Sequence, residues 1–138
     1  MIDVPGHKIV AQWPNGCEKA RGTALDADRG FLFVACGEGM AVVLNVNRGG
    51  QQTDLQAVGA GVDLMDYNPK LSHLYVPSSK NKAFYVFGVS SKGELSMLGS
   101  GKSSARSHCV AADDQNGVWV CDPEHGQLLH YQDSFPSS

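Results

Sequence analysis

A repeat with a period in the low forties constrains the fold of this chain more than any other sequence feature. The 138-residue sequence contains three similar segments: TALDADRGFLFVAC (23–36), DLMDYNPKLSHLYVPS (63–78) and HCVAADDQNGVWVCD (108–122). In each, a short apolar run leads into a polar turn, and a strand rich in Val, Phe, Tyr or Trp follows. The three segments are therefore read as copies of one structural unit.

The spacing of the copies predicts the architecture. Aligning them on the polar residue of the turn selects Asp26, Asn68 and Asp113. The same alignment selects one valine of the following strand in each copy, at spacings of 42 and 44 residues: Val34, Val76 and Val120. A unit of this length with four strands predicts an all-β chain of β-propeller blades. An all-β sandwich is the alternative.

The predicted strands form two complete units and one incomplete unit. They are 23–26, 31–36, 40–46 and 53–58, then 64–67, 73–77, 83–89 and 95–98, and finally 109–112, 118–121 and 127–132. A spare strand, 8–13, precedes them and follows the end of another strand at 2–4. Helix content is expected to be near zero, because no window combines a 3.6-residue apolar period with helix caps.

Composition excludes several classes of protein. Hydrophobic residues make up 42% and charged residues 18%, which is not the composition of a disordered tail. The net charge of −3 provides no basic field, so we expect no nucleic-acid partner. No apolar run approaches the length of a membrane span, so we expect no membrane partner either. The 16 glycines agree with a turn-rich all-β chain.

The four cysteines, Cys17, Cys36, Cys109 and Cys121, have neither CxxC spacing nor a regular framework. Cys36 and Cys109 lie in or beside apolar strands, where a free thiol behaves as a small buried hydrophobe. The N-terminus has no charged region followed by an apolar stretch. We therefore expect free thiols and a cytoplasmic location, with a periplasmic one left open if a leader has been removed.

The same repeat resembles a known family. The pattern ALD-x5-LFVAC lies at 24–36, a G-x-x-VVLNV strand ends at Val46, and G-x-G-V-D lies at 59–63. Together these resemble the YVTN-type, or lactonase-like, bacterial β-propellers over nearly the whole chain. The resemblance implies a propeller of twice as many blades or more. It also implies a hydrolase or lyase that acts near the channel, often with a divalent metal held by acidic and polar side chains.

Three blades are too few to close a ring, because known rings begin at about four blades. An open arc leaves two apolar blade faces in water and an unpaired strand at 127–132. We expect two chains to form a six-bladed ring, in which strand 8–13 of each chain completes the last blade of its partner. A fragment of a longer propeller and a nine-bladed trimer are the alternatives.

Candidate site residues occupy one equivalent position in the three units, five residues before the turn landmark. They are Arg21, Asp63 and His108, and Glu18 and Arg106 lie in the same loops. Ligand sites of propellers usually lie at the channel mouth, where these loops converge. A small anionic or polar molecule could bind there, with an arginine as the bidentate group. The alternative is that these side chains have a structural role and only form ion pairs or hydrogen bonds that hold their own loops.

A metal site is a weaker hypothesis for the same residues. His108 and Asp63 from two chains could supply four ligands to a divalent metal only if the symmetry axis brings them close together. A redox or metal role that joins His108 to Cys109 is disfavoured, because neighbouring strand residues point to opposite faces. No catalytic residue and no cofactor are assigned.

These observations favour a non-enzymatic homodimeric propeller that binds a small ligand or a protein at its channel face. The alternative is a metal-dependent lactonase-like or lyase-like enzyme with its site at the channel mouth. The scattered histidines and the turn carboxylates form no motif that would decide for catalysis.

Overall fold

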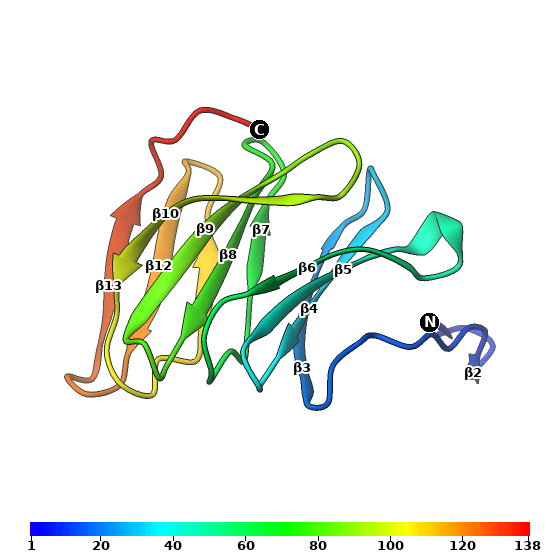
Figure 1. The fold of residues 1–138 in the computed structure, drawn as a ribbon, viewed down its shortest axis with the longest axis horizontal. Helices are drawn as coiled ribbons and strands as arrows, with labels where there is room; N and C mark the ends of the chain where they lie inside the picture. The colour runs from blue at the N-terminus through cyan, green and yellow to red at the C-terminus, as the bar shows by residue number, and fades with distance from the viewer.

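Each unit of the repeat folds into one antiparallel sheet, as Figure 1 shows for the computed structural model of residues 1–138. The first sheet holds β3 (Ala20–Asp26), β4 (Phe31–Cys36), β5 (Met40–Asn45) and β6 (Gln51–Ala57). The second holds β7 (Asp66–Asn68), β8 (His73–Ser78), β9 (Ala83–Val89) and β10 (Leu95–Lys102). The third holds β11 (Val110–Ala112), β12 (Gly117–Asp122) and β13 (Gln127–Gln132).

The three sheets are consecutive blades of a β-propeller. Within each sheet the hydrogen-bonded order follows the chain, from an inner strand (β3, β7 or β11) outward. The three inner strands are neighbours in that order. The predicted all-β fold with three blades is confirmed, and the only helical element is a single 3-10 turn, Val46–Arg48.

Three strands have the predicted boundaries. The predicted bounds of 31–36, 83–89 and 127–132 are those of β4, β9 and β13. Strand β10 continues four residues beyond the predicted end at residue 98, through a bulge between Met97 and Gly99. Its last residues, GSGK, have little strand propensity. Their pairing with β9 holds them in the sheet, from Gly99 opposite Val86 to Lys102 opposite Ala83.

The prediction of a strand at 8–13 is correct only for its first two residues. The segment forms β2 (Lys8–Ile9), which pairs with β1 (Ile2–Asp3) in a small hairpin. Residues 10–13 are not strand. The hairpin stands beside the first blade (Figure 1), and β13 is an edge strand with one paired neighbour, β12.

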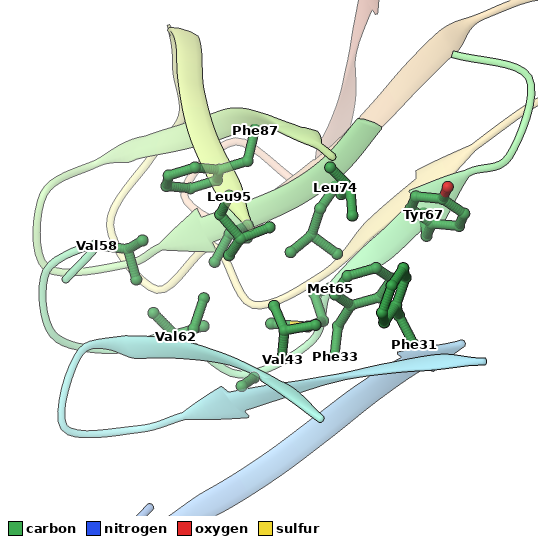
Figure 2. Packing of buried hydrophobic residues seen from close by; sticks show 14 residues of the cluster. Phe31, Phe33, Val43, Val58, Val62, Met65, Tyr67, Leu74, Phe87 and Leu95 are labelled. Carbon is green, nitrogen blue, oxygen red and sulfur yellow. The ribbon is translucent and has the colours of Figure 1, made fainter. Parts of the chain in front are cut away.

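The main core lies between the first and second blades. It contains 14 buried residues, and Figure 2 shows their side chains meeting from the two sheets. Phe33 from β4 packs against the ring of Tyr67 from β7, with 5.1 Å between centroids. Strand alternation produces this core, because odd-numbered residues of β4 face the second blade and even-numbered residues face outward. A second core joins the second and third blades around Tyr75, Val118 and Val120.

A buried polar cluster also joins the first two blades. The Tyr67 hydroxyl donates to the Asp26 carboxylate at 2.9 Å, and the Arg29 guanidinium donates to both of these side chains. Arg29 also donates to the carbonyl of Val89 at 3.1 Å. Burial alone would raise the pKa of Asp26, but the hydrogen bonds from Arg29 and Tyr67 outweigh it and lower that pKa. The turn position that marks the repeat thus holds one blade to the next.

The segment that follows β13 returns to the second blade. The buried Asp133 carboxylate accepts from the Tyr75 hydroxyl at 2.6 Å and lies 2.7 Å from Nδ1 of the buried His73. The amide of Ser138 donates to the carbonyl of Leu71 at 2.9 Å. In Figure 1 this end of the chain lies above β7, far from the N-terminal hairpin. The arc is therefore braced at both of its internal blade junctions.

The expectation of free thiols is wrong. Cys17 is bonded to Cys36, and Cys109 is bonded to Cys121, each pair with its Cα atoms 5.3 Å apart. Propeller topology explains the pairing, because the segment before an inner strand runs beside the end of the second strand of the same blade. Spacing along the chain could not show this, since the pairs are 19 and 12 residues apart.

Reduction of the two disulfides is expected to destabilise the fold. Closing loops of this length removes conformational entropy from the unfolded chain and is worth about 3 kcal/mol per bridge. Alkylation before reduction should modify no cysteine, and alkylation after reduction should modify four. Urea unfolding with and without reductant would measure the stability change, with Cys17→Ser as the single-bridge control. Full alkylation of the unreduced protein would contradict the pairing.

Candidate functional site

The loops that lead into the three inner strands lie side by side at one end of the arc. We call them the entry loops, and the surface they form the mouth. The amide of Gly22 donates to the carbonyl of Asp63 at 2.8 Å, and the amide of Leu64 donates to the carbonyl of His108 at 3.1 Å. These backbone bonds join each entry loop to the next one. They place Arg21, which lies at the start of β3, and Asp63 and His108, which lie in the next two entry loops, in consecutive blades.

Asp63 and His108 form a pair across two blades. The carboxylate Oδ2 of Asp63 lies 3.6 Å from Nδ1 of His108. The side chains are 37% and 53% exposed, so both can contact a molecule at the mouth. A carboxylate and an imidazole next to each other offer one acceptor and one group that can donate or accept. The pair is suited to binding a polar group that needs both kinds of hydrogen bond.

The other three candidate residues do not join this pair. Arg21 forms no ion pair, and its side chain passes over Gly37 and lines the outer face of the first blade. Glu18 and Arg106 are exposed in their loops. Arg106 adopts a left-handed backbone with φ of 61°. The structure thus brings two of the five predicted residues into contact.

The turns between the second and third strands hold the entry loops in place. In the first blade the carboxylate of Glu38 accepts from the amides of Glu18 and Lys19, at 2.8 and 3.1 Å. In the third blade Glu124 accepts from the amide of Ala105 at 2.9 Å. Glu38 and Glu124 occupy equivalent repeat positions, 86 residues apart as are Val34 and Val120. This equivalence is visible in the repeat, although neither glutamate was predicted as a loop-holding residue.

The second blade makes the corresponding contact through hydroxyl groups. Ser78 Oγ donates to the carbonyl of Ala60 at 3.1 Å, and Ser79 Oγ donates to the carbonyl of Gly61 at 3.0 Å. The entry loop of this blade also approaches Gly39 of the first blade, which has a φ of 116°. A Cβ atom at Gly39 would lie 2.8 Å from the backbone of Gly59, so only glycine fits at this contact.

Asp122 anchors the entry loop that carries Arg106 and His108. Hydrogen bonds from Gln127, Ser104 and His125 lower its pKa to about 2. The Gln127 amide donates to Oδ2 at 2.9 Å, and His125 Nδ1 lies 2.8 Å from the same oxygen. The loop is further held by Ser107, whose buried hydroxyl donates to the carbonyl of Cys121 at 2.7 Å.

Metal-ligating groups gather at one place other than the mouth. Cys17, Cys36 and Glu38 lie within ligand distance of one another, but both thiols are used in the disulfide. At the mouth, Asp63 and His108 supply two donor groups. Zinc sites in proteins use three or four protein ligands, so this pair alone is short of a zinc site.

A groove lies on the outer face of the first blade. Its volume is about 710 Å³, and 11 of its 15 lining residues are hydrophobic. Its floor comes from β3, β4 and β5, and its far wall comes from the N-terminal hairpin. An uncovered blade face was predicted from the sequence, but this groove was not.

No protein-family model and no curated protein matches the sequence. Among solved structures, the chain is similar to a protein from Lactobacillus plantarum, with TM-score 0.68 and 13% identity over 94% of this chain and 46% of that one. It is also similar to a chain of the mitotic checkpoint complex, with TM-score 0.66 and 12% identity over 83% of this chain and 36% of that one. A chain of Kuenenia stuttgartiensis hydrazine synthase gives TM-score 0.62 and 13% identity over 94% and 40%.

These neighbours have β-propeller-like folds, which agrees with the blade arrangement described above. The chain spans less than half the length of each of them. At 12–13% identity the likeness shows the fold alone. The structure contains no helical segment that could span a lipid bilayer.

Replacing Asp122 by asparagine is expected to loosen the entry loop and lower stability near neutral pH. The pKa of Asp122 falls from its usual 3.8 to about 2 on folding, so its contribution is present above pH 4 and is lost as the pH falls towards 2. The stability difference between wild type and Asp122→Asn should therefore shrink over that interval. Urea unfolding between pH 6 and pH 2 measures it, and a difference that is constant with pH would contradict this role.

Proposed function

We propose that this chain is a non-enzymatic β-propeller scaffold that binds a small polar or anionic molecule, or a polar protein segment, at its channel mouth. The pairing of Asp63 with His108 across two blades carries the proposal, because both side chains are partly exposed and both stand on braced loops. A preformed site of this kind loses little conformational entropy on binding. The exposed Arg106 lies two residues from His108 and supplies a cation for an anionic group.

A second copy of the chain completes the ring in this proposal. The last blade has three strands, and β13 presents an unpaired edge. The first blade has an apolar groove on its outer face. Two arcs of three blades joined by a two-fold axis would cover both features and close six blades around one channel. The mouth would then carry the Asp63–His108 pair twice.

We further propose a type of propeller and a cellular compartment for this chain. The repeat residues at 24–36 and 59–63 favour a lactonase-like propeller of the YVTN type. Two disulfides favour an oxidising compartment over the cytoplasmic location that the sequence led us to expect, because thiols are kept reduced in the cytosol. A metal-dependent enzyme would have to use the two Asp63–His108 pairs of the ring as its ligands.

Titration of the protein with citrate, inorganic phosphate and Zn²⁺, followed by NMR of the histidine rings, tests the mouth. We expect a saturable shift of the His108 signal with citrate or phosphate. Arg106→Ala should weaken this binding about tenfold, since a charge-assisted hydrogen bond is lost. His7→Ala, in the remote N-terminal hairpin, is the matched control and should bind as wild type does.

Two results of that titration would contradict the proposal. If citrate and phosphate leave the His108 signal unchanged, the mouth is not an anion site. If Zn²⁺ shifts the His108 signal and Asp63→Asn abolishes that shift, the mouth is a metal site, as the alternative holds. Lactone and ester hydrolysis assays on wild type, Asp63→Ala and His108→Ala then decide whether that metal supports catalysis.

A further inference from the structure

One position of the repeat is aromatic in all three blades, and in the first two blades its side chain faces the following blade. The alignment that makes Val34, Val76 and Val120 equivalent places the aromatic residue just before each of them: Phe33, Tyr75 and Trp119. Phe33 and Tyr75 are fully buried between their own blade and the following one. Trp119, the equivalent residue of the third blade, is 39% exposed on the face of that blade that points away from the second blade.

The residues that receive this aromatic side chain are also equivalent from blade to blade. In the second blade the surface that packs against Phe33 contains Tyr67, Leu74, Val76 and Phe87, and Figure 2 labels Tyr67, Leu74 and Phe87 among the side chains of this core. The surface of the third blade that packs against Tyr75 contains Val118 and Val120, with Ala112 packed against them. The corresponding positions of the first blade are Leu25, Leu32, Val34 and Leu44.

Those four residues of the first blade line the groove on its outer face. Val34 and Leu44 are buried in the groove floor, whereas Leu25 is 54% exposed. The groove is thus formed by the positions that receive the aromatic side chain at a blade junction, and the one aromatic residue that lines it, Trp13, comes from the segment after the N-terminal hairpin and not from another blade. Trp119 stands on the opposite end of the arc and is the aromatic residue of the repeat that lacks a receiving surface.

From this match we infer that Trp119 of one copy inserts into the groove of a second copy, so that the dimer interface repeats the internal blade junction twice. The inference rests on the proposed two-chain ring and specifies its contact. Each copy contributes one aromatic residue and one groove, which is a heterologous contact that closes after two copies.

The surroundings of both surfaces fit a second copy as the occupant. Next to Trp119, the apolar Leu128 is 60% exposed on the same outer face, opposite Cys121 in the strand register. Two contacts fix the orientation of the indole ring on this face. The ring stacks on the His130 ring with 4.1 Å between centroids, and its Nε1 donates to the Asp113 carboxylate at 2.9 Å. The outer wall of the groove, formed by the N-terminal hairpin, would lie against the edge strand β13 of the partner.

A charge-swap experiment tests this contact by analytical ultracentrifugation. Wild type should sediment as a dimer, with twice the monomer mass of 14.7 kDa. Trp119→Glu and Leu25→Arg should each raise the dimer dissociation constant at least about 30-fold, because each places a charge in an apolar contact. An equimolar mixture of the two variants should restore dimers. In the mixed dimer the introduced carboxylate of one variant would meet the introduced guanidinium of the other, while the second junction keeps its native residues.

Met97→Glu is the matched control, because Met97 is 55% exposed on β10 and lies outside both surfaces. It should leave the dimer unchanged. Circular dichroism of each variant establishes folding, and Leu128→Glu replaces Trp119→Glu if that variant does not fold.

The outcomes separate the two proposals. A monomeric wild type overturns the ring and this contact with it. A dimeric wild type whose Trp119→Glu and Leu25→Arg variants are equally dimeric keeps a dimer but overturns this contact. Single variants that are monomeric and fail to pair when mixed also overturn it, because the two positions then do not face each other.

Discussion

The packing of one aromatic side chain against the next blade is the interaction on which the rest of this structure depends. A single blade exposes apolar residues on both faces and cannot be stable alone. Phe33 and Tyr75 fill the two internal junctions, and the surfaces that receive them are built from equivalent positions of the following blade. Because the junction is the same each time, the arc carries an aromatic residue at one end and an apolar groove at the other.

The junctions also position the candidate site. Inner strands come side by side because the faces of their blades pack together, and this lets the amides of Gly22 and Leu64 reach the entry loops of the next blades. The turns between the second and third strands also fix the entry loops, because Glu38 in the first blade and Glu124 in the third accept hydrogen bonds from loop amides. Asp63 and His108 meet as a result of blade packing, with no contact of their own shorter than 3.6 Å.

The repeat predicted the blades, which depend on periodicity, although the equivalent loop contacts of Glu38 and Glu124 were missed, and it failed where a single tertiary contact decides. Strand alternation and the 42-residue spacing were enough for the blades and for the equivalence of Asp63 with His108. The same spacing could not predict that Arg21 passes over Gly37, because one side-chain rotamer sets that direction. The Cys17–Cys36 bridge was missed because its partners meet only when the entry loop returns beside β4. Residues 10–13 read as a strand although β1 pairs with Lys8–Ile9 alone, since sequence propensity does not identify the strand's partner.

The central claim is that the two outer faces of the arc are complementary halves of one blade junction. Small-angle X-ray scattering of the wild-type protein tests it most directly, because a closed disc with a central channel and an open crescent have different distance distributions. The account predicts the scattering curve of a six-bladed disc built from two arcs. A curve that fits a single three-bladed arc, or two arcs joined side by side without a channel, would contradict it.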